Sequence, residues 1–433
     1  MKEDFLHFLW RYQRFDWVAL STTVGEPIAL LHPGEPNLHA GPDFLHARVR
    51  IDGTLWAGNV EIHIRSSEWT HHKHHADPAY DNVVLHVVLE EDQIIHRANG
   101  ERIPCLELRN RIFPGMRQAY FQLMSQNYWI PCQTQWGAVP ALTKDLWIER
   151  LAIERLEQRT EKIQEMLARN TSNWEETFYQ AFARSLGYPA NADPFEELAR
   201  SCPLGLLSKK RDQLMPLEAF LFGQAGFLEG HFQDDYPKEL QKEYRFLQKK
   251  HRLTPMQGKV WKFMRMRPAN FPTLRIAQLA RLVHQTNHLF DKAMSIQSME
   301  ELHHMLELKV SSYWRTHYRF DHPSPQQVKS FGKSAIHNIL INAIAPLLFV
   351  YGVKGHNMAF MDRAMALLTQ LPPEDNHVVR RWGSMGYPPA NAAQSQALLY
   401  LKKTYCDEKK CLHCAIGHTL LKGDGQGQSL NVM

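Results

Sequence analysis

A change in the spacing of apolar residues near position 110 limits the folds open to this chain more than any other feature of its sequence. Before it, apolar and polar residues alternate, which is typical of strands with one buried face. After it, apolar residues recur every three or four positions, which is typical of amphipathic helices. The pattern therefore predicts an α+β fold, with a small mixed or antiparallel sheet domain followed by a large all-helical region. The expected strands lie at 27–32, 43–51, 54–64, 82–90 and 103–108.

The sheet domain is expected to span residues 1–111 and to begin with an amphipathic helix over 2–13. An Asp-Gly pair at 52–53, between the second and third strands, is a strong signal for a tight hairpin turn. A short helix is expected before the fourth strand, because Ser67 is a suitable N-cap and Pro78 would end a helix.

The helical region is expected to span residues 112–433, with prolines and glycines breaking it into segments. A division into two helical subdomains near 250–270 is one option. The region ends in a cysteine-rich segment at 406–418 and carries no glycine-rich phosphate-binding loop. The expected helices lie at 144–170, 174–186, 194–200, 216–230, 236–250, 273–290, 298–316, 324–350, 358–370 and 391–404.

Asp43, Glu61 and His63 are the residues of the expected hairpin that are most suited to chemistry. In a regular ladder closed by the turn at 52–53, Asp43 faces away from Glu61 and His63. One extra residue in the third strand, at Gly58, would bring Asp43 onto their face, and glycine inside a strand is a typical marker of such a bulge.

Two carboxylates and a neutral imidazole are suitable ligands for a hard or borderline divalent ion, and the expected cofactor is Mg²⁺ or Mn²⁺. Such an ion activates water and stabilises the charge that develops in phosphoryl transfer. The alternative is that Asp43 and Glu61 only cap a turn and line an exposed strand face.

Pro42-Asp43, then seventeen residues, then Glu61-Ile62-His63 resemble the PD-(D/E)XK nuclease signature. In that family the Asp begins one strand of a hairpin, and the (D/E)-x-K triplet lies on the next. The expected order of helix, three antiparallel strands, short helix and fourth strand is also similar to the family's core. The resemblance covers about the first 95 residues. It implies a nuclease in which Asp43 and Glu61 bind metal and His63 replaces the lysine, without that lysine's permanent positive charge.

Nearly the whole chain resembles a family of bacterial proteins known only as a domain of unknown function, and this likeness implies no activity. The segments that carry it are PNLHAGPDF (36–44), WAGNVEIHIRSSEW (56–69), YDNVVLHVV (80–88), MRPANFPTLRIAQLA (266–280) and KKCLHCAIG (409–417).

Several of the 24 histidines crowd the segment after the third strand. His71 and His75 would share one face of the expected short helix, an arrangement suited to binding metal. The alternative is a group of solvated side chains. His86 alternates with valines on the fourth strand, where a hydrogen-bonded histidine on a sheet face is expected.

Cys406, Cys411, Cys414 and His418 form a second candidate metal site. Thiolates and an imidazole at this spacing can supply four ligands to zinc. The three cysteines and a remote fourth could instead hold an iron–sulfur cluster, which some PD-(D/E)XK relatives carry. The alternative is a final helix with buried thiols.

Lys262, Arg265, Arg267 and Arg275 lie among aromatic residues, as in proteins that bind a phosphate backbone. The net charge of +5 permits nucleic acid as a partner without requiring it. An ordinary helix junction would explain the same residues.

No membrane partner is expected, because the N-terminal residues lack the apolar core of a signal peptide. The longest apolar run, 339–352, is too short to span a bilayer and is expected to form a buried helix. Six cysteines in 433 residues do not suggest a disulfide scaffold, so a cytoplasmic location is expected.

Three functions are compatible with these features. The first is a divalent-metal-dependent nuclease or related phosphodiester hydrolase, with a helical region that binds nucleic acid. The second is a non-catalytic binding or scaffold protein with a degenerate nuclease-like domain. The third is a metal-dependent hydrolase of a small molecule. A single-ion site needs both carboxylates on one face, because oxygen ligands lie within about 2.6 Å of the ion.

Overall fold

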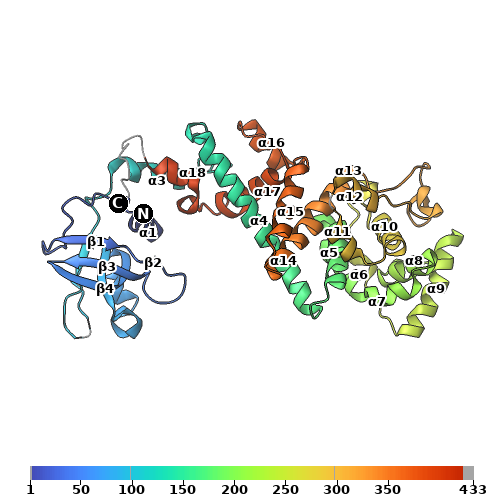
Figure 1. The fold of residues 1–433 in the computed structure, drawn as a ribbon, viewed down its shortest axis with the longest axis horizontal. Coiled ribbons are helices and arrows are strands. Elements are labelled where there is room, and N and C mark those ends of the chain that lie inside the picture. Colours follow the sequence, from blue (N-terminus) through green and yellow to red (C-terminus); the bar gives the residue numbers. More distant parts are fainter. Residues whose placement is uncertain (1, 98, 297, 423–433) are drawn as a thin grey trace. The chain divides into compact units, whose positions relative to one another are not determined.

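The computed structural model describes residues 2–422 except 98 and 297, and it confirms the predicted α+β fold class (Figure 1). The N-terminal sheet has the order β1-β3-β4-β5-β6, with β2 paired to β3. Its strands are β1 (Ile28–His32), β2 (Glu35–Pro36), β3 (Phe44–Ile51), β4 (Thr54–Arg65), β5 (Val83–Glu90) and β6 (Cys105–Glu107).

The sheet is mixed, as predicted. β3 and β4 form an antiparallel hairpin, and both turn residues, Asp52 and Gly53, have positive φ, as the tight turn requires. β5 runs parallel to β4, and β6 runs parallel to β5. The parallel pairing places the carboxyl ends of β4, β5 and β6 at one edge of the sheet, and the loop that follows β4 begins at this edge.

The irregularity that aligns the two carboxylates lies in β3 and not in β4. The register shifts by one residue between Phe44 and Ala47, so β3 carries the extra residue. His46, within this stretch, has a φ of 59°, in the left-handed region. As a result Asp43 lies beside Glu61, with its backbone N–H 3.1 Å from Glu61 Oε2.

The predicted bulge at Gly58 is therefore wrong. Gly58 pairs regularly with Ala47, and its missing side chain serves a different purpose. A Cβ on Gly58 would lie 2.5 Å from the carbonyl oxygen of Asn82 and 2.5 Å from Cγ1 of Val84. Glycine is needed here because the chain entering β5 passes directly over β4.

The helix α1 (Glu3–Arg11) packs against β4, and it confirms the expected N-terminal helix. Its apolar face is removed from water, which contributes roughly 1.5–3 kcal/mol for each large side chain. The buried residues of this helix are Phe5, Leu6, Phe8, Leu9 and Trp10. The packing brings the opposite, polar side of the first turn close to the start of β3.

Between β4 and β5 the chain forms three short helical turns and not the single helix that was expected. They are α2 (Glu68–His71), η1 (His74–Ala76) and η2 (Pro78–Tyr80). The break occurs at Lys73, which has a φ of 61°. The Asp77 side chain accepts the N–H of Ala79 and caps the last turn.

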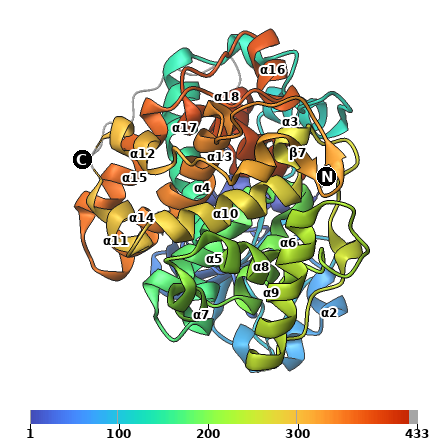
Figure 2. The same ribbon diagram turned by 90° about the vertical axis from the view of Figure 1, so that its right-hand side faces the viewer.

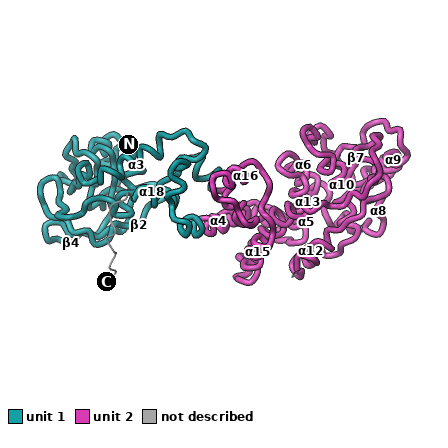
Figure 3. Tube along the Cα trace, turned by 90° about the horizontal axis from the view of Figure 1, so that it is seen from above, with its two compact units in different colours: residues 1–147, 401–433 teal, residues 148–400 magenta. Residues whose placement is uncertain are grey.

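The chain divides into two compact units (Figure 3): unit 1 is 1–147 with 401–433, and unit 2 is 148–400. This division differs from the expected boundary at 111, and unit 2 is not split near 250–270. The cause is that α3 (Pro114–Ser125) and the last described helix, α18 (Ala415–Leu421), pack on each other. Lys409 Nζ also donates to the carbonyl oxygen of Met124 at 2.9 Å.

Unit 2 is helical apart from a small hairpin of β7 (His317–Arg319) and β8 (His322–Pro323). α5 packs on α6, α8 packs on α9 and α10, and α14 packs on α15 (Figure 2). Its helices are α4 (Ala141–Arg169, which begins in unit 1), α5 (Trp174–Leu186), α6 (Tyr188–Ser201), α7 (Leu204–Leu207), α8 (Leu214–Gln224), α9 (Asp235–His251), α10 (Pro272–Gln285), α11 (Leu289–Ser295), α12 (Met299–Met305), α13 (Lys333–Ile339), α14 (Ala345–Lys354), α15 (Met358–Gln370), α16 (His377–Ser384) and α17 (Ala392–Tyr400).

The longest apolar run lies in a continuous helical stretch, Lys333–Lys354, in which a π-helical turn joins α13 to α14. By length and composition alone this stretch of 22 residues could cross a membrane. However, 72% of its most apolar window is buried inside the fold, as in the core helix of a soluble protein. The predicted buried helix is thus present, and it covers Lys333–Lys354 where 324–350 was expected.

Candidate metal centre

The two predicted carboxylates, Asp43 and Glu61, lie side by side at the end of the β3–β4 hairpin that is opposite its turn. The backbone N–H of Asp43 donates to Glu61 Oε2 at 3.1 Å, and the N–H of Ile62 donates to Asp43 Oδ2 at 3.0 Å. Each carboxylate is therefore held by the backbone of the opposite strand. Glu61 is only 4% exposed, so its position is fixed by the surrounding fold.

Two histidines face Glu61, and a third lies beside them. His63 Nε2 lies 3.6 Å from Glu61 Oε1, and His74 Nε2 lies 3.3 Å from the same oxygen. His63 Nε2 also lies 3.2 Å from His72 Nδ1, and ligand atoms of the three histidines all lie within 4.8 Å of one another. Atoms bound tetrahedrally at about 2.1 Å from one ion lie about 3.4 Å apart. The distances of 3.2, 3.3 and 3.6 Å are close to this spacing, so the three histidines are grouped as metal ligands, with Glu61 beside two of them.

The loop after β4 is shaped by aromatic packing. The rings of His74 and Tyr80 stack with centroids 3.8 Å apart, and Trp69 meets both rings edge-on. The left-handed conformation of Lys73 reverses the chain between His72 and His74, so that both side chains turn toward β4. Trp69 and Tyr80 are buried in a small apolar cluster, which anchors the loop.

A fourth histidine supports the first of these ligands. His63 Nδ1 lies 2.9 Å from His86 Nε2, and both residues are 1% exposed. His86 lies on β5, beside β4, and its ring packs against Trp69. This contact orients His63 so that its Nε2 atom points toward Glu61, which is the usual role of a hydrogen-bond partner behind a metal-binding histidine.

The imidazoles of this group are held in their neutral form. Burial, together with the neighbouring His86, His74 and His72, lowers the pKa of His63 to about 2. Burial and His74 lower the pKa of His86 to about 3, and burial also lowers the pKa of His74. Neutral imidazole is the form that binds a metal ion, so these ligands need lose no proton at neutral pH.

The carboxylates, in contrast, are crowded by negative charge. Burial and the neighbouring Asp43 raise the pKa of Glu61 to about 9, and burial and Asp43 raise the pKa of Glu3 to about 7. A divalent cation placed beside Glu61 would remove this penalty, because it favours the ionised carboxylate.

Helix α1 contributes Glu3 and His7, which the sequence analysis did not identify. His7 Nε2 lies 3.3 Å from Asp43 Oδ2. Burial opposes protonation of His7, but its interactions with Asp43 and Glu3 outweigh burial, so the pKa of His7 is raised. The i, i+4 spacing of Glu3 and His7 places them on one helical face, yet no sequence pattern indicates that this face meets the hairpin.

His71 and His75 do not form the pair that the sequence predicted. The helix α2 ends at His71, so the two residues do not share a helical face, and both are exposed. His72 and His74, which lie between them, face His63 instead. The structure therefore groups His72 and His74 with His63, and not the pair that the helical spacing indicated.

The predicted cysteine site is also changed. His418 Nε2 lies 2.6 Å from the carbonyl oxygen of Leu412, so this nitrogen is already used inside the fold. Cys406, Cys411 and Cys414 instead line one cavity together with Cys132, a residue from the segment after α3.

Of the four predicted nucleic-acid contacts, Lys262, Arg265 and Arg267 are exposed. Arg275 is 3% exposed, and its guanidinium donates to Asn270 Oδ1 at 2.7 Å and packs over the ring of Phe331. Arg275 therefore stabilises the start of α10 and does not present its charge at the surface.

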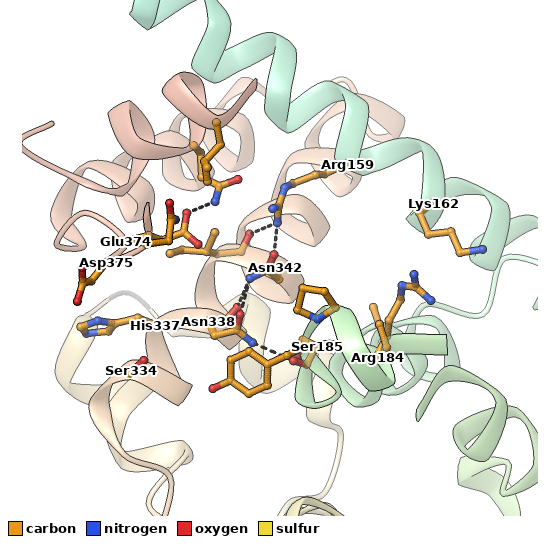
Figure 4. Close-up of a pocket in the computed structure, with 18 of the residues that line it drawn as sticks. Arg159, Lys162, Arg184, Ser185, Ser334, His337, Asn338, Asn342, Glu374 and Asp375 are labelled. Atoms are coloured by element: carbon orange, nitrogen blue, oxygen red, sulfur yellow. Dashed lines mark hydrogen bonds between the residues drawn. The ribbon is translucent and has the colours of Figure 1, made fainter. Parts of the chain in front are cut away.

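Unit 2 contains a cavity of about 770 Å³ (Figure 4). Its charged side chains are engaged within the fold: Arg159 donates to Asn342, Arg184 pairs with Glu196 at 2.7 Å, and the Gln396 amide donates to Glu374. These contacts explain how the cavity wall is held. The convergent ligand set near β4 is the stronger candidate for chemistry.

The model of a family described as "Protein of unknown function (DUF2851)" matches residues 3–377, which include the whole of the centre near β4. No curated protein and no solved structure matches the chain.

Proposed function

The chain belongs to the DUF2851 family, whose description names no activity, and we propose that unit 1 is a divalent-metal-dependent phosphodiester hydrolase acting on nucleic acid. One observation carries the proposal: ligand atoms of His63, His72 and His74 lie within 4.8 Å of one another, and two of these histidines contact Glu61, which lies beside a second carboxylate, Asp43.

The ligand set indicates which ion it would hold. Three imidazoles and a carboxylate favour Mn²⁺ or a borderline ion such as Zn²⁺, whereas Mg²⁺ prefers oxygen ligands and retained waters. Of the two ions expected from the sequence, Mn²⁺ is thus the better suited. The bound ion would activate water and stabilise negative charge on a phosphodiester.

The residues around the ligands fit a path for proton transfer. Asp43 lies beside Glu61 and His7 Nε2 lies 3.3 Å from Asp43 Oδ2, so a protonated His7 held by Asp43 can donate a proton to the leaving group as a general acid. The raised pKa of His7 keeps it cationic over more of the neutral range. His7 thereby supplies a positive charge next to Asp43, which the neutral His63 does not.

Nucleic acid is proposed as the substrate because phosphodiesters are its backbone and the chain has a net charge of +5. Lys262, Arg265 and Arg267 are exposed on unit 2 and are proposed to contact phosphates. A cytoplasmic location accords with six free cysteines, which form no disulfide.

A non-catalytic binding protein is the second candidate, and the environment of His63 favours it. The nuclease signature has a lysine at this position, whereas His63 is 1% exposed, neutral and in contact with His86. In this case the metal would only stabilise the loop after β4, and the chain would bind nucleic acid without cleaving it.

Cleavage and metal binding can be tested with a matched pair of loop variants. Full-length protein is incubated with Mn²⁺, Zn²⁺ or Mg²⁺ and with single- and double-stranded DNA, RNA and bis(p-nitrophenyl) phosphate. We expect Mn²⁺- or Zn²⁺-dependent cleavage that Glu61→Gln abolishes. His72→Ala should weaken metal binding by at least about tenfold, because it removes a ligand. His71→Ala, one residue away and exposed, should leave it unchanged.

The results separate the candidates. Metal binding that depends on His72 without cleavage of any substrate would favour the binding protein. Cleavage of bis(p-nitrophenyl) phosphate alone would favour a hydrolase of small molecules. Equal metal affinity in the His71 and His72 variants would contradict the ligand assignment itself.

A further inference from the structure

Four cysteines from three separate segments face one cavity in unit 1. Cys132 follows α3, Cys406 ends a π-helical turn after α17, and Cys411 and Cys414 flank a short 3-10 turn before α18. Cys132, Cys411 and Cys414 are each less than 10% exposed, and Cys406 is half-buried. All of them are free thiols.

Each pair among these four thiols is close enough to interact electrostatically. Burial, together with the Cys414 and Cys411 thiols, raises the pKa of Cys132 to about 12. Burial also raises the pKa of Cys406, with added contributions from Cys414, Cys132 and Cys411, and the pKa of Cys411 is affected in the same way by Cys414. Each of these thiols thus interacts electrostatically with the other three.

Backbone groups at the start of α18 orient the sulfur of Cys414. The backbone N–H groups of Ile416 and Gly417 point at the Cys414 sulfur. The first turn of α18 lies directly against Cys411. Glycine is needed at position 417 because a Cβ there would lie 2.1 Å from the Cys411 carbonyl oxygen. Backbone N–H groups aimed at a sulfur are typical of thiolates that bind metal, because they stabilise the negative charge.

The spacing of the sulfurs distinguishes the kinds of metal centre. Thiolates about 2.3 Å from one tetrahedral zinc ion lie about 3.8 Å apart. Within the described residues, convergence of three ligand atoms to within 4.8 Å is found for the histidines near β4 and not for these sulfurs. A cluster in which each cysteine binds a different iron accommodates wider spacing.

We propose that Cys132, Cys406, Cys411 and Cys414 bind an iron–sulfur cluster that joins the last described segment of the chain to the segment after α3. His418, the fourth ligand considered from the sequence, does not line the cavity, and its Nε2 atom is engaged with the carbonyl oxygen of Leu412. The inference is independent of the phosphodiesterase proposal, because the cavity shares no residue with the centre near β4.

The test is the metal content and visible spectrum of the full-length protein, purified without oxygen and then reconstituted with iron and sulfide. We expect about four iron and about four sulfide ions per chain, as for a cluster in which each of the four cysteines binds a different iron. Cys132→Ser should lose the cluster. Cys202→Ser is the control, because Cys202 is buried at 0% exposure in unit 2. His418→Ala should keep the cluster.

A second measurement covers the case in which Cys132→Ser does not fold. In the wild-type protein, alkylation followed by mass spectrometry should find the four thiols protected until the iron is removed by a chelator. Three results would overturn the proposal: one zinc ion per chain without sulfide, a full cluster retained in folded Cys132→Ser, or rapid alkylation of all four thiols that chelator does not change.

Discussion

Binding of a divalent ion at the histidine centre should release one proton, and that proton should come from Glu61. In the metal-free protein, burial and Asp43 raise the pKa of Glu61 to about 9, whereas the pKa of His63 is lowered to about 2. Between about pH 7.5 and about pH 9, Glu61 must therefore lose its proton before it can bind the ion as a carboxylate, while His63 has none to lose.

The size of the effect follows from this single proton. Metal affinity should rise about tenfold for each pH unit in this window, which corresponds to about 1.4 kcal/mol per unit. From about pH 7.5 to about pH 8.5 the dissociation constant should fall about tenfold, and above about pH 9 the increase should level off. In Glu61→Gln, which has the same shape but no proton to release, the affinity should not depend on pH in this window.

Isothermal titration calorimetry measures both quantities. Titrations of Mn²⁺ or Zn²⁺ in two buffers with different heats of ionisation give the number of protons released, and a pH series gives the slope. His71→Ala serves as the control and should behave as the wild type. The reasoning is refuted if Glu61→Gln still releases about one proton, because the proton would then come from another ligand.

Three other changes test the packing of Gly58, the burial of His63 and the structural role of Arg275. Gly58→Ala should lower the free energy of unfolding by more than about 2 kcal/mol in urea denaturation, because its Cβ would lie 2.5 Å from the Asn82 carbonyl oxygen. Gly115→Ala is the control, since nothing lies within 4 Å of its Cβ, and it should change this free energy by less than about 0.5 kcal/mol. Equal effects of the two substitutions would contradict this explanation. Acidification below about pH 6.5 should destabilise the metal-free protein by about 1.4 kcal/mol per pH unit through His63, because the unfolded state takes up the proton first. The pH dependence of unfolding should be shallower in His63→Gln, and an unchanged slope would exclude this cause. Arg275→Ala should reduce stability without weakening nucleic-acid binding in a salt-dependent binding assay, since the guanidinium is only 3% exposed; a selective loss of binding would show the opposite.

The sheet could be predicted because its signals are local. Alternation of apolar residues and the Asp-Gly turn determined the hairpin and its pairing near the turn. The bulge was predicted at the wrong residue because a glycine inside a strand can mark either a bulge or the close approach of another segment of the chain. At Gly58 the cause is the close approach of Asn82, which depends on a strand that follows later in the chain. His46, the residue in the left-handed conformation, carries no glycine-like signal.

The residues that the structure groups at the two proposed centres could be predicted only in part from the sequence. His72 and His74 could not be separated from His71 and His75, because the choice depends on a backbone reversal at Lys73 that no local pattern required. A helical spacing rule applies only while the helix continues.

Cys132 was missed for a different reason. It lies far along the chain from the other three cysteines, and only the packing of α3 with α18 brings it near them. Spacing rules detect ligands that share a segment, so they found three members of this group and added His418 in place of the fourth.

The return of residues 401–422 to unit 1 has a consequence for the order in which the protein is made. The ribosome completes residues 1–147 first, but their remaining packing partners emerge only after the whole of unit 2 has been synthesised. At about 5–20 residues per second, these on the order of 250 residues take roughly 13 to 50 s. During that interval the nascent chain exposes the apolar surface of α3 that α18 later covers, which makes this surface a binding site for chaperones. A ribosome that stalls in unit 2 therefore leaves an incomplete sheet unit, even though every strand has already been translated.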